Sequence, residues 1–151
     1  MTKRIYGALA LDVPSGFDDE SVVILKAPAA TPAVKMRAPS GEARRPTLVV
    51  RRVSLASDAS LTELVDAEER ALTGAVPGLA FTERTAHTVG GLDAVVRELT
   101  IPAPDGTVRQ VHVSVRANAA LYVFVATALD DLEFASTRAT LLSVVDSARF
   151  D

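Results

Sequence analysis

The sequence has no cysteine and two histidines, His87 and His112. The lack of cysteine excludes disulfides, thiolate nucleophiles and cysteine-ligated metal sites. A zinc centre needs three or four histidine, cysteine or carboxylate ligands at characteristic spacings, and no such spacing occurs. The glycine-rich phosphate loop and the dinucleotide fingerprint are also missing. We therefore expect no metal ion and no cofactor.

Long apolar runs are missing as well. No window approaches the roughly 18 consecutive apolar residues that a membrane-spanning helix needs. The first ten residues carry two positive charges but lack the apolar run and cleavage site of a signal peptide. The formal charge of −3 argues against nucleic acid or an anionic membrane as the main partner. These features predict a cytoplasmic protein that does not insert into a membrane.

The length of 151 residues, with 48% hydrophobic and 23% charged residues, predicts one globular domain that spans positions 1–151. One stretch, at about 28–46, interrupts the pattern with four prolines, many alanines and several basic residues. Proline and small residues without periodicity are typical of a flexible loop. We interpret this stretch as a Pro/Ala-rich loop inside the domain.

The stretch from Thr107 to Leu129 predicts the central hairpin of an antiparallel sheet. Its first arm alternates apolar valines with polar residues, which is typical of a half-buried strand. Asn118 tolerates the positive φ that a short turn requires. The second arm, from Ala120 onward, is apolar on both faces and therefore needs cover on both. That cover is either the protein's own helices or a bound partner.

Further elements follow from the same reasoning. Ser60 and Glu63 form a capping box that predicts the start of a helix, and Asp130-Asp131 predicts the N-cap of a second helix that runs to about Val145. The acidic run Asp18–Glu20 is interpreted as a solvated turn, and Gly90-Gly91 as a tight turn. Strands are predicted at Ile5–Leu11, Ser21–Ala27, Thr47–Leu55, Leu79–Val89, Leu92–Ile101 and Ser147–Phe150. The fold class is α+β, with an antiparallel sheet of six to seven strands flanked by two helices.

Candidate catalytic residues are scarce. Ser114 and His112 fall on one strand face at two-residue spacing, but no third carboxylate is evident to orient the histidine. We therefore assign no catalytic residue and expect a binding protein instead of an enzyme.

A series of short motifs in a fixed order resembles the DcrB-related family. The motifs are Leu11-Asp-Val-Pro14-Ser-Gly-Phe17, Leu48-Val-Val-Arg51, Pro77-Gly-Leu79, Gly90-Gly-Leu92-Asp-Ala94 and Ser147-Ala-Arg-Phe150. The resemblance spans essentially the whole chain. It implies the α/β/α sandwich of PsbP-like proteins.

Small members of that family without signal peptides resemble the effector-associated (Eag-type) chaperones of type VI secretion. The resemblance implies a cytoplasmic homodimer that holds the hydrophobic N-terminal transmembrane helices of a secreted effector of the PAAR/Rhs type. Such a chaperone assists loading of its effector onto the VgrG spike. An apolar sheet face would serve as the groove for these helices. By position, we place Val22, Ile24, Leu48 and Val50 on it.

Two alternatives remain open. The same four residues could simply pack beneath one of the protein's own helices. The protein could also carry a small hydrophobic ligand in a cavity between the sheet and a helix.

Overall fold

The computed structural model describes residues 2–6, 9–13, 18–21, 24–26, 46–104, 106–129 and 134–150. For the segments before residue 46 it describes the course of the backbone alone. Most of the predicted 28–46 loop and the residue Val22 therefore lie outside the described residues.

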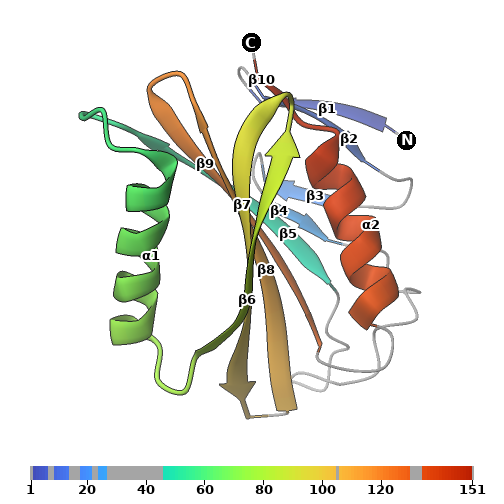
Figure 1. Ribbon diagram of the computed structural model, residues 1–151. Coiled ribbons are helices and arrows are strands. Elements are labelled where there is room, and N and C mark those ends of the chain that lie inside the picture. Colours follow the sequence, from blue (N-terminus) through green and yellow to red (C-terminus); the bar gives the residue numbers. More distant parts are fainter. Residues whose placement is uncertain are drawn as a thin grey trace.

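The main sheet is antiparallel and is built around the predicted hairpin (Figure 1). β8 (Gly106–Ala117) and β9 (Ala120–Leu129) form this hairpin, with Asn118 at a φ of 55° in its turn. β7 (Leu92–Ala103) and β6 (Ala80–Val89) follow on the β8 side. β5 (Thr47–Ser54) pairs with β9, and the short β4 (Ile24–Lys26) and β3 (Asp18–Ser21) continue the sheet beyond β5.

The N-terminal strands differ from the prediction. The sequence predicts one strand at Ile5–Leu11, whereas the structure has β1 (Thr2–Tyr6) and β2 (Leu9–Val13), which pair antiparallel. Among the described residues, they form a separate three-stranded sheet with β10 (Arg149–Phe150). The apolar stretch Ile5–Leu11 begins in β1 and ends in β2, so its composition does not reveal that it is divided between two strands.

Two predictions on the next segment are also wrong. The acidic run that was interpreted as a turn lies within β3, and the strand expected at Ser21–Ala27 is reduced to β4. β3 is the outermost strand on this side of the sheet. Charged residues are common on edge strands because they discourage pairing with another chain. Consecutive carboxylates are therefore compatible with a strand at this position, although they usually indicate a turn.

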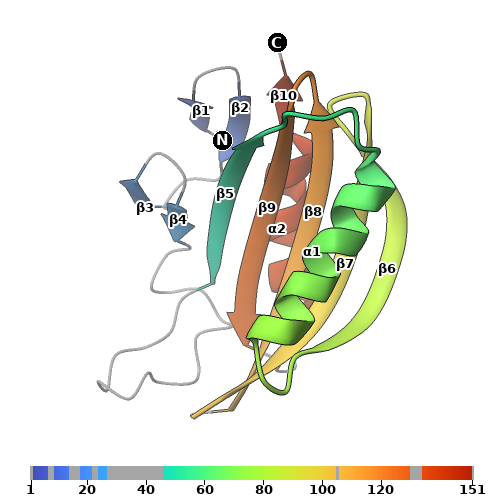
Figure 2. The ribbon, with the colours of Figure 1, turned by 90° about the vertical axis from the view of Figure 1, so that its left-hand side faces the viewer.

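Two helices cover opposite faces of the sheet in the described part of the chain. α1 (Leu61–Ala75) begins as predicted: the Glu63 backbone N–H donates to Ser60 Oγ at 3.2 Å, and the Ser60 backbone N–H donates to Glu63 Oε2 at 2.8 Å. α2 is Phe134–Asp146. In Figure 2, α1 lies in front of the sheet and α2 behind it. The α+β class, the two helices and the antiparallel sheet are confirmed.

The β6–β7 connection is the expected two-residue turn. Gly90 and Gly91 both have positive φ, 59° and 78°, between the paired residues Val89 and Leu92. Positive φ at both central residues defines the type I′ turn, whose twist matches that of the flanking strands. This turn fixes the register of β6 on β7.

The hydrophobic core lies between the sheet and α2. Val111, Val113 and Val115 point to this side, as the alternation predicts, and are at most 2% exposed. They pack with side chains from the neighbouring strands and from α2, among them Val50, Phe124, Phe134, Leu141 and Val144. The helix thus closes this face with apolar contacts, which stabilise the fold by removing apolar surface from water.

Candidate functional site

The structure separates the residues that the sequence placed on one binding face. Leu48 and Val50 are 0% and 4% exposed and belong to the core beneath α2. Ile24 is paired with Val49, whereas Leu48 is paired with Leu25. Directly paired residues of an antiparallel sheet share a face. The register therefore groups Ile24 with Val49 and does not bring it together with Leu48 and Val50.

The face of the sheet beneath α1 has a different character, because charged side chains lie there among buried apolar ones such as Leu99 and Val123. Arg97 of β7 has no exposed side-chain surface, and its Nη2 donates to Glu68 Oε2 of α1 at 3.1 Å. Arg51 of β5 donates to the other oxygen of the same carboxylate at 2.7 Å. At the β6 side, Arg84 donates to Asp66 of α1 at 2.7 Å. Among the described residues of α1, only Val65 is fully buried.

Two adjacent residues of β7 form ion pairs with the two different helices. Next to Arg97 in the chain, Glu98 faces the other side of the sheet, where Arg138 Nε of α2 donates to it at 2.6 Å. Burial of Glu98 acts to raise its pKa, but hydrogen bonds from Glu83 and Arg138 and the positive charge of Arg138 outweigh it, and the net shift is downward. Sequence reasoning gave this pair no role. The available signal was two consecutive charged residues inside an apolar strand.

The hydrogen-bond donors of Arg97 are only partly paired. Its Nη2 also donates to Ser114 Oγ at 3.3 Å, and its guanidinium lies 6.0 Å from the centre of the Phe81 ring. Its Nε and Nη1 are buried without a hydrogen-bond partner. The nearest acid to Nη1 is Glu69, at 4.0 Å. A buried cation in this state depends on its ion pair with Glu68.

His112 is unsuited to act as a general base for Ser114. Burial, followed by the positive charges of Arg97 and Arg51, lowers the pKa of His112 to about 3. Its neutral ring donates from Nε2 to Gln110 Oε1 at 2.8 Å, and Gln110 Nε2 donates to Thr127 Oγ1 at 3.1 Å. A base with so low a pKa removes protons poorly at neutral pH. Ser114 is instead the acceptor for Arg97.

β5 carries the one exposed large hydrophobic side chain in the described part of the chain. Val53 is 44% exposed, and Val49 is partly exposed on the same face of the strand. Arg51 lies between them with half of its side chain exposed. Figure 2 shows β5 next to β9, with neither α1 nor α2 in front of it. This β5 strip, which consists of Val49, Arg51 and Val53, continues toward Ile24 through the β4 register.

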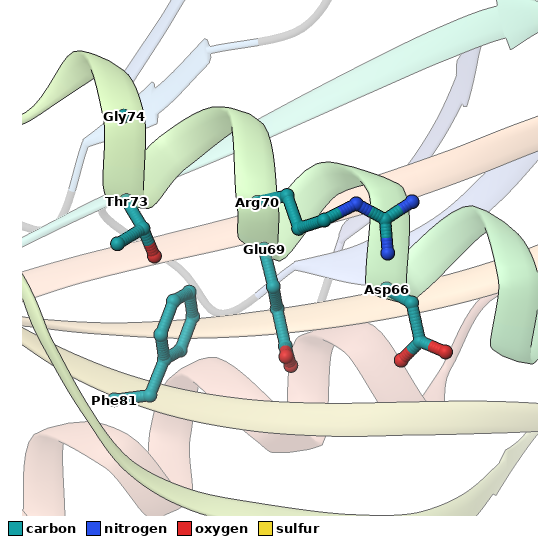
Figure 3. A pocket seen from close by; sticks show the side chains of 6 residues that line it. All are labelled: Asp66, Glu69, Arg70, Thr73, Gly74 and Phe81. Carbon is teal, nitrogen blue, oxygen red and sulfur yellow. The ribbon is translucent and has the colours of Figure 1, made fainter.

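A groove of about 570 Å³ opens on the other side of α1. In Figure 3, Phe81 of β6 points toward Thr73 of α1, and Glu69 descends beside it. The groove is lined by Asp66, Glu69, Arg70, Thr73, Gly74 and Phe81. Within the described residues there is no group of three or more potential metal ligands, and no helix is long and apolar enough to cross a membrane.

Comparison with family models decides the family. The DcrB model matches residues 9–147. The chain belongs to the DcrB family. A search of curated proteins finds no match to this member.

Solved structures with this fold come from diverse organisms. Cyanobacterial PsbP from Synechocystis has a TM-score of 0.65 at 17% identity, over 95% of this DcrB-family chain and 87% of that one. A Pseudomonas aeruginosa protein of unknown function has a TM-score of 0.64 at 20% identity, over 92% and 90%. Mycobacterium tuberculosis LpqN, described as involved in cell envelope biogenesis, has a TM-score of 0.63 at 20% identity, over 93% and 82%. At these identities the likeness shows the fold alone, and the fold is PsbP-like.

Proposed function

We propose that this DcrB-family protein is a non-enzymatic, cytoplasmic chaperone or adaptor. Its client is a type VI secretion effector of the PAAR/Rhs type, whose hydrophobic N-terminal transmembrane helices it keeps in solution until the effector is loaded onto the VgrG spike. Family membership and the resemblance to effector-associated chaperones support the proposal. The low pKa of His112 and the hydrogen bond that Arg97 donates to Ser114 favour binding over catalysis.

The β5 strip is the observation that carries the proposal. Val49 and Val53 present apolar surface on the α1 side of the sheet, at β5, which neither helix crosses in Figure 2. A client helix laid there would run beside α1, and helices pack at separations of roughly 8–10 Å. The aliphatic stem of Arg51 adds apolar contact while its charge stays on Glu68. Ile24, the cross-strand partner of Val49, extends the strip into β4.

This placement gives the four predicted site residues different tasks. Ile24 stays a candidate contact, and Val22 lies outside the described residues. Leu48 and Val50 stabilise the core, so a client that contacted them would have to displace α2. Their direct contact with a client stays a prediction.

The test is affinity purification of the tagged protein from its native host, followed by mass spectrometry of what comes with it. We expect a large protein with apolar N-terminal helices. The double variant Val49→Gln/Val53→Gln should lose this protein, because two amides replace the apolar contacts on the strip. Arg52→Gln is the matched control, since Arg52 lies on the same strand but on the opposite face, at 6.0 Å from the Tyr122 ring.

The possible outcomes distinguish a wrong binding site from a wrong function. Recovery of the same client with the double variant would overturn the β5 strip, and Val22→Gln/Ile24→Gln would then test the neighbouring strand. If the wild-type protein recovers no such client, the chaperone function itself is wrong. Circular dichroism of each variant verifies that it remains folded.

A second candidate is the transport of a small hydrophobic ligand, and the groove between α1 and β6 favours it. Its volume of about 570 Å³ lies in the range of small-molecule sites, roughly 300–1,000 Å³. Native mass spectrometry of the purified protein should then detect a bound lipid-like molecule. Gly74→Leu would fill the groove and abolish this binding, while leaving client recovery unchanged.

A further inference from the structure

The groove between α1 and β6 lies beside a buried cation. Phe81 and Glu69 line the groove (Figure 3), and both are also neighbours of Arg97. The guanidinium of Arg97 lies 6.0 Å from the centre of the Phe81 ring, and its Nη1 lies 4.0 Å from Glu69 Oε1. The side chain of Arg97 has no exposed surface. Two lining residues of the groove therefore cover a positive charge.

The Nη1 group of Arg97 is a hydrogen-bond donor without an acceptor among the described residues. Nη2 is bonded to Glu68 and Ser114, on the other side of the guanidinium from Glu69. A buried donor that is left unbonded costs free energy, because water solvates it in the unfolded chain. Such donors are rare in native proteins and call for an explanation. Since the acid nearest to Nη1 lines the groove, a ligand in the groove can supply the missing acceptor.

The carboxylate of Glu69 is only loosely held. Arg84 Nη1 lies 3.4 Å from each of its two oxygens, beyond the roughly 2.7–2.9 Å of a strong charge-assisted hydrogen bond. The 4.0 Å approach to Arg97 is too long for a hydrogen bond. The side chain of Glu69 is 25% exposed, so it can turn into the water. Another carboxylate can then take its place beside Arg97.

The charges around the groove favour an anion. The ion pairs between α1 and the sheet, together with the groove lining, comprise four arginines and three carboxylates: Arg51, Arg70, Arg84 and Arg97 against Asp66, Glu68 and Glu69. This part of the molecule has one excess positive charge, although the whole chain has a formal charge of −3. A local excess of one sign attracts ligands of the other sign.

The remainder of the groove has apolar surface. The Phe81 ring points toward Thr73 of α1 (Figure 3), and Phe81 is paired with Leu99, which is 0% exposed. Gly74 contributes no side chain, and a Cβ there meets no atom within 4 Å. Small-molecule sites usually combine such apolar walls with a few polar groups that fix the orientation of the ligand.

We propose that the groove binds an amphipathic monocarboxylate, a small molecule with an apolar body and one carboxylate. The body lies between Phe81 and Thr73, and the carboxylate displaces Glu69 and accepts a hydrogen bond from Arg97 Nη1. Arginine is well suited to this task, because its hydrogen bonds to carboxylates are charge-assisted. The inference rests on the second candidate function, the transport of a small hydrophobic ligand, and names the chemical class of that ligand.

Isothermal titration calorimetry of the purified protein tests the head group with three ligands of one chain length. Decanoate, decanol and decylamine are compared below the concentrations at which they form micelles. Decanoate should bind at least about tenfold more tightly than decanol, because only the carboxylate supplies a charged acceptor for Nη1. Decylamine should bind most weakly, since it brings a second positive charge to Arg97.

Replacing Glu69 by glutamine tests the displacement without removing the cation. The variant lacks the competing carboxylate, so its affinity for decanoate should rise about tenfold while its affinity for decanol stays unchanged. Glu83→Gln is the matched control: it changes the net charge equally, but Glu83 is paired with Glu98 and hydrogen-bonded to it on the α2 side of the sheet. It should leave both affinities unchanged.

Replacing Arg97 by lysine tests the donor itself. Lysine keeps a positive charge near Glu68 but lacks the guanidinium Nη1, so this variant should bind decanoate and decanol with similar affinity. Circular dichroism verifies that it is folded. If it does not fold, the Glu69→Gln result decides.

The results distinguish a wrong head group from a wrong site. Equal binding of decanoate and decanol by the wild type would overturn the carboxylate assignment and leave ligand transport standing. Unchanged decanoate binding by Glu69→Gln would also overturn it. If none of the three ligands binds, or if Gly74→Leu binds them like the wild type, the groove is not their site, and the transport function is wrong together with this inference.

Discussion

Arg97 and Glu98 are neighbours in β7, and each forms an ion pair with a different helix on a different face of the sheet. Arg97 bonds Glu68 of α1 at 3.1 Å, and Glu98 bonds Arg138 of α2 at 2.6 Å. The two pairs differ in their surroundings. The Arg138 pair lies at the margin of an apolar core, whereas the Arg97 pair is at the centre of a polar interface that holds only one fully buried residue of α1.

Replacing Glu68 by glutamine should therefore destabilise the protein. Arg97 would stay buried without a full countercharge, at a cost of about 2 kcal/mol in the free energy of unfolding. Glu69→Gln is the matched control on the same helix turn, because Glu69 is 4.0 Å from Arg97 and more exposed. It should cost less than about 0.5 kcal/mol. Urea unfolding measures both values, and equal losses would contradict a dominant Arg97–Glu68 pair.

His112 should make stability depend on pH in a defined window. Its pKa is about 3 in the folded protein against 6.5 for an unperturbed histidine. The unfolded chain therefore binds a proton below about pH 6.5 while the folded protein does not, so stability is lost as pH falls. Between about pH 7 and about pH 5, the wild type should lose about 2 kcal/mol more than His112→Asn. Parallel pH profiles of the two proteins would argue against a neutral buried ring.

The two turn glycines should respond differently to alanine. Both have positive φ, and a side chain there costs about 1 kcal/mol in each case. A Cβ on Gly90 would also lie 2.9 Å from the Ala148 carbonyl oxygen, whereas one on Gly91 meets nothing within 4 Å. We expect Gly90→Ala to cost at least about 2–3 kcal/mol and Gly91→Ala about 1 kcal/mol. Thermal unfolding of the pair measures the difference, and an equal effect would exclude the contact.

Replacing Gly74 by alanine should have the opposite effect on stability. It lies in the last turn of α1 and has helical backbone angles, and a Cβ there meets no atom within 4 Å. Alanine should stabilise the protein by about 0.5–1 kcal/mol, because glycine loses more backbone entropy in a helix. Chemical denaturation of Gly74→Ala measures the gain. A loss of stability would indicate that the groove lining needs glycine.

Local patterns predicted much of the main sheet and α1. The alternating valines of β8 identified the central hairpin, Asn118 and Gly90-Gly91 supplied the required positive φ, and the Ser60–Glu63 capping box located the start of α1. Each of these signals is contained in a few consecutive residues. Such signals predict the folded structure correctly because the physical requirement that each one meets is local.

Long-range relationships were not predictable in the same way. The separate sheet of β1, β2 and β10 joins the two ends of the chain, and no local pattern encodes that pairing. The register that aligns Ile24 with Val49 depends on how β4 meets β5, and a one-residue difference reverses the faces. Arg97 was missed because its burial depends on Glu68, 29 positions earlier in the chain.

The contrast between the two helix interfaces has a consequence for local unfolding. α2 can leave the sheet only by exposing the main apolar core, whereas α1 exposes fewer fully buried apolar residues and also releases ion pairs that water and salt can replace. The amides of α1 should therefore exchange through a sub-global opening that preserves the sheet and α2. The protein would then consist of two cooperative units, a durable one built on α2 and a weaker one that is the α1 helix itself.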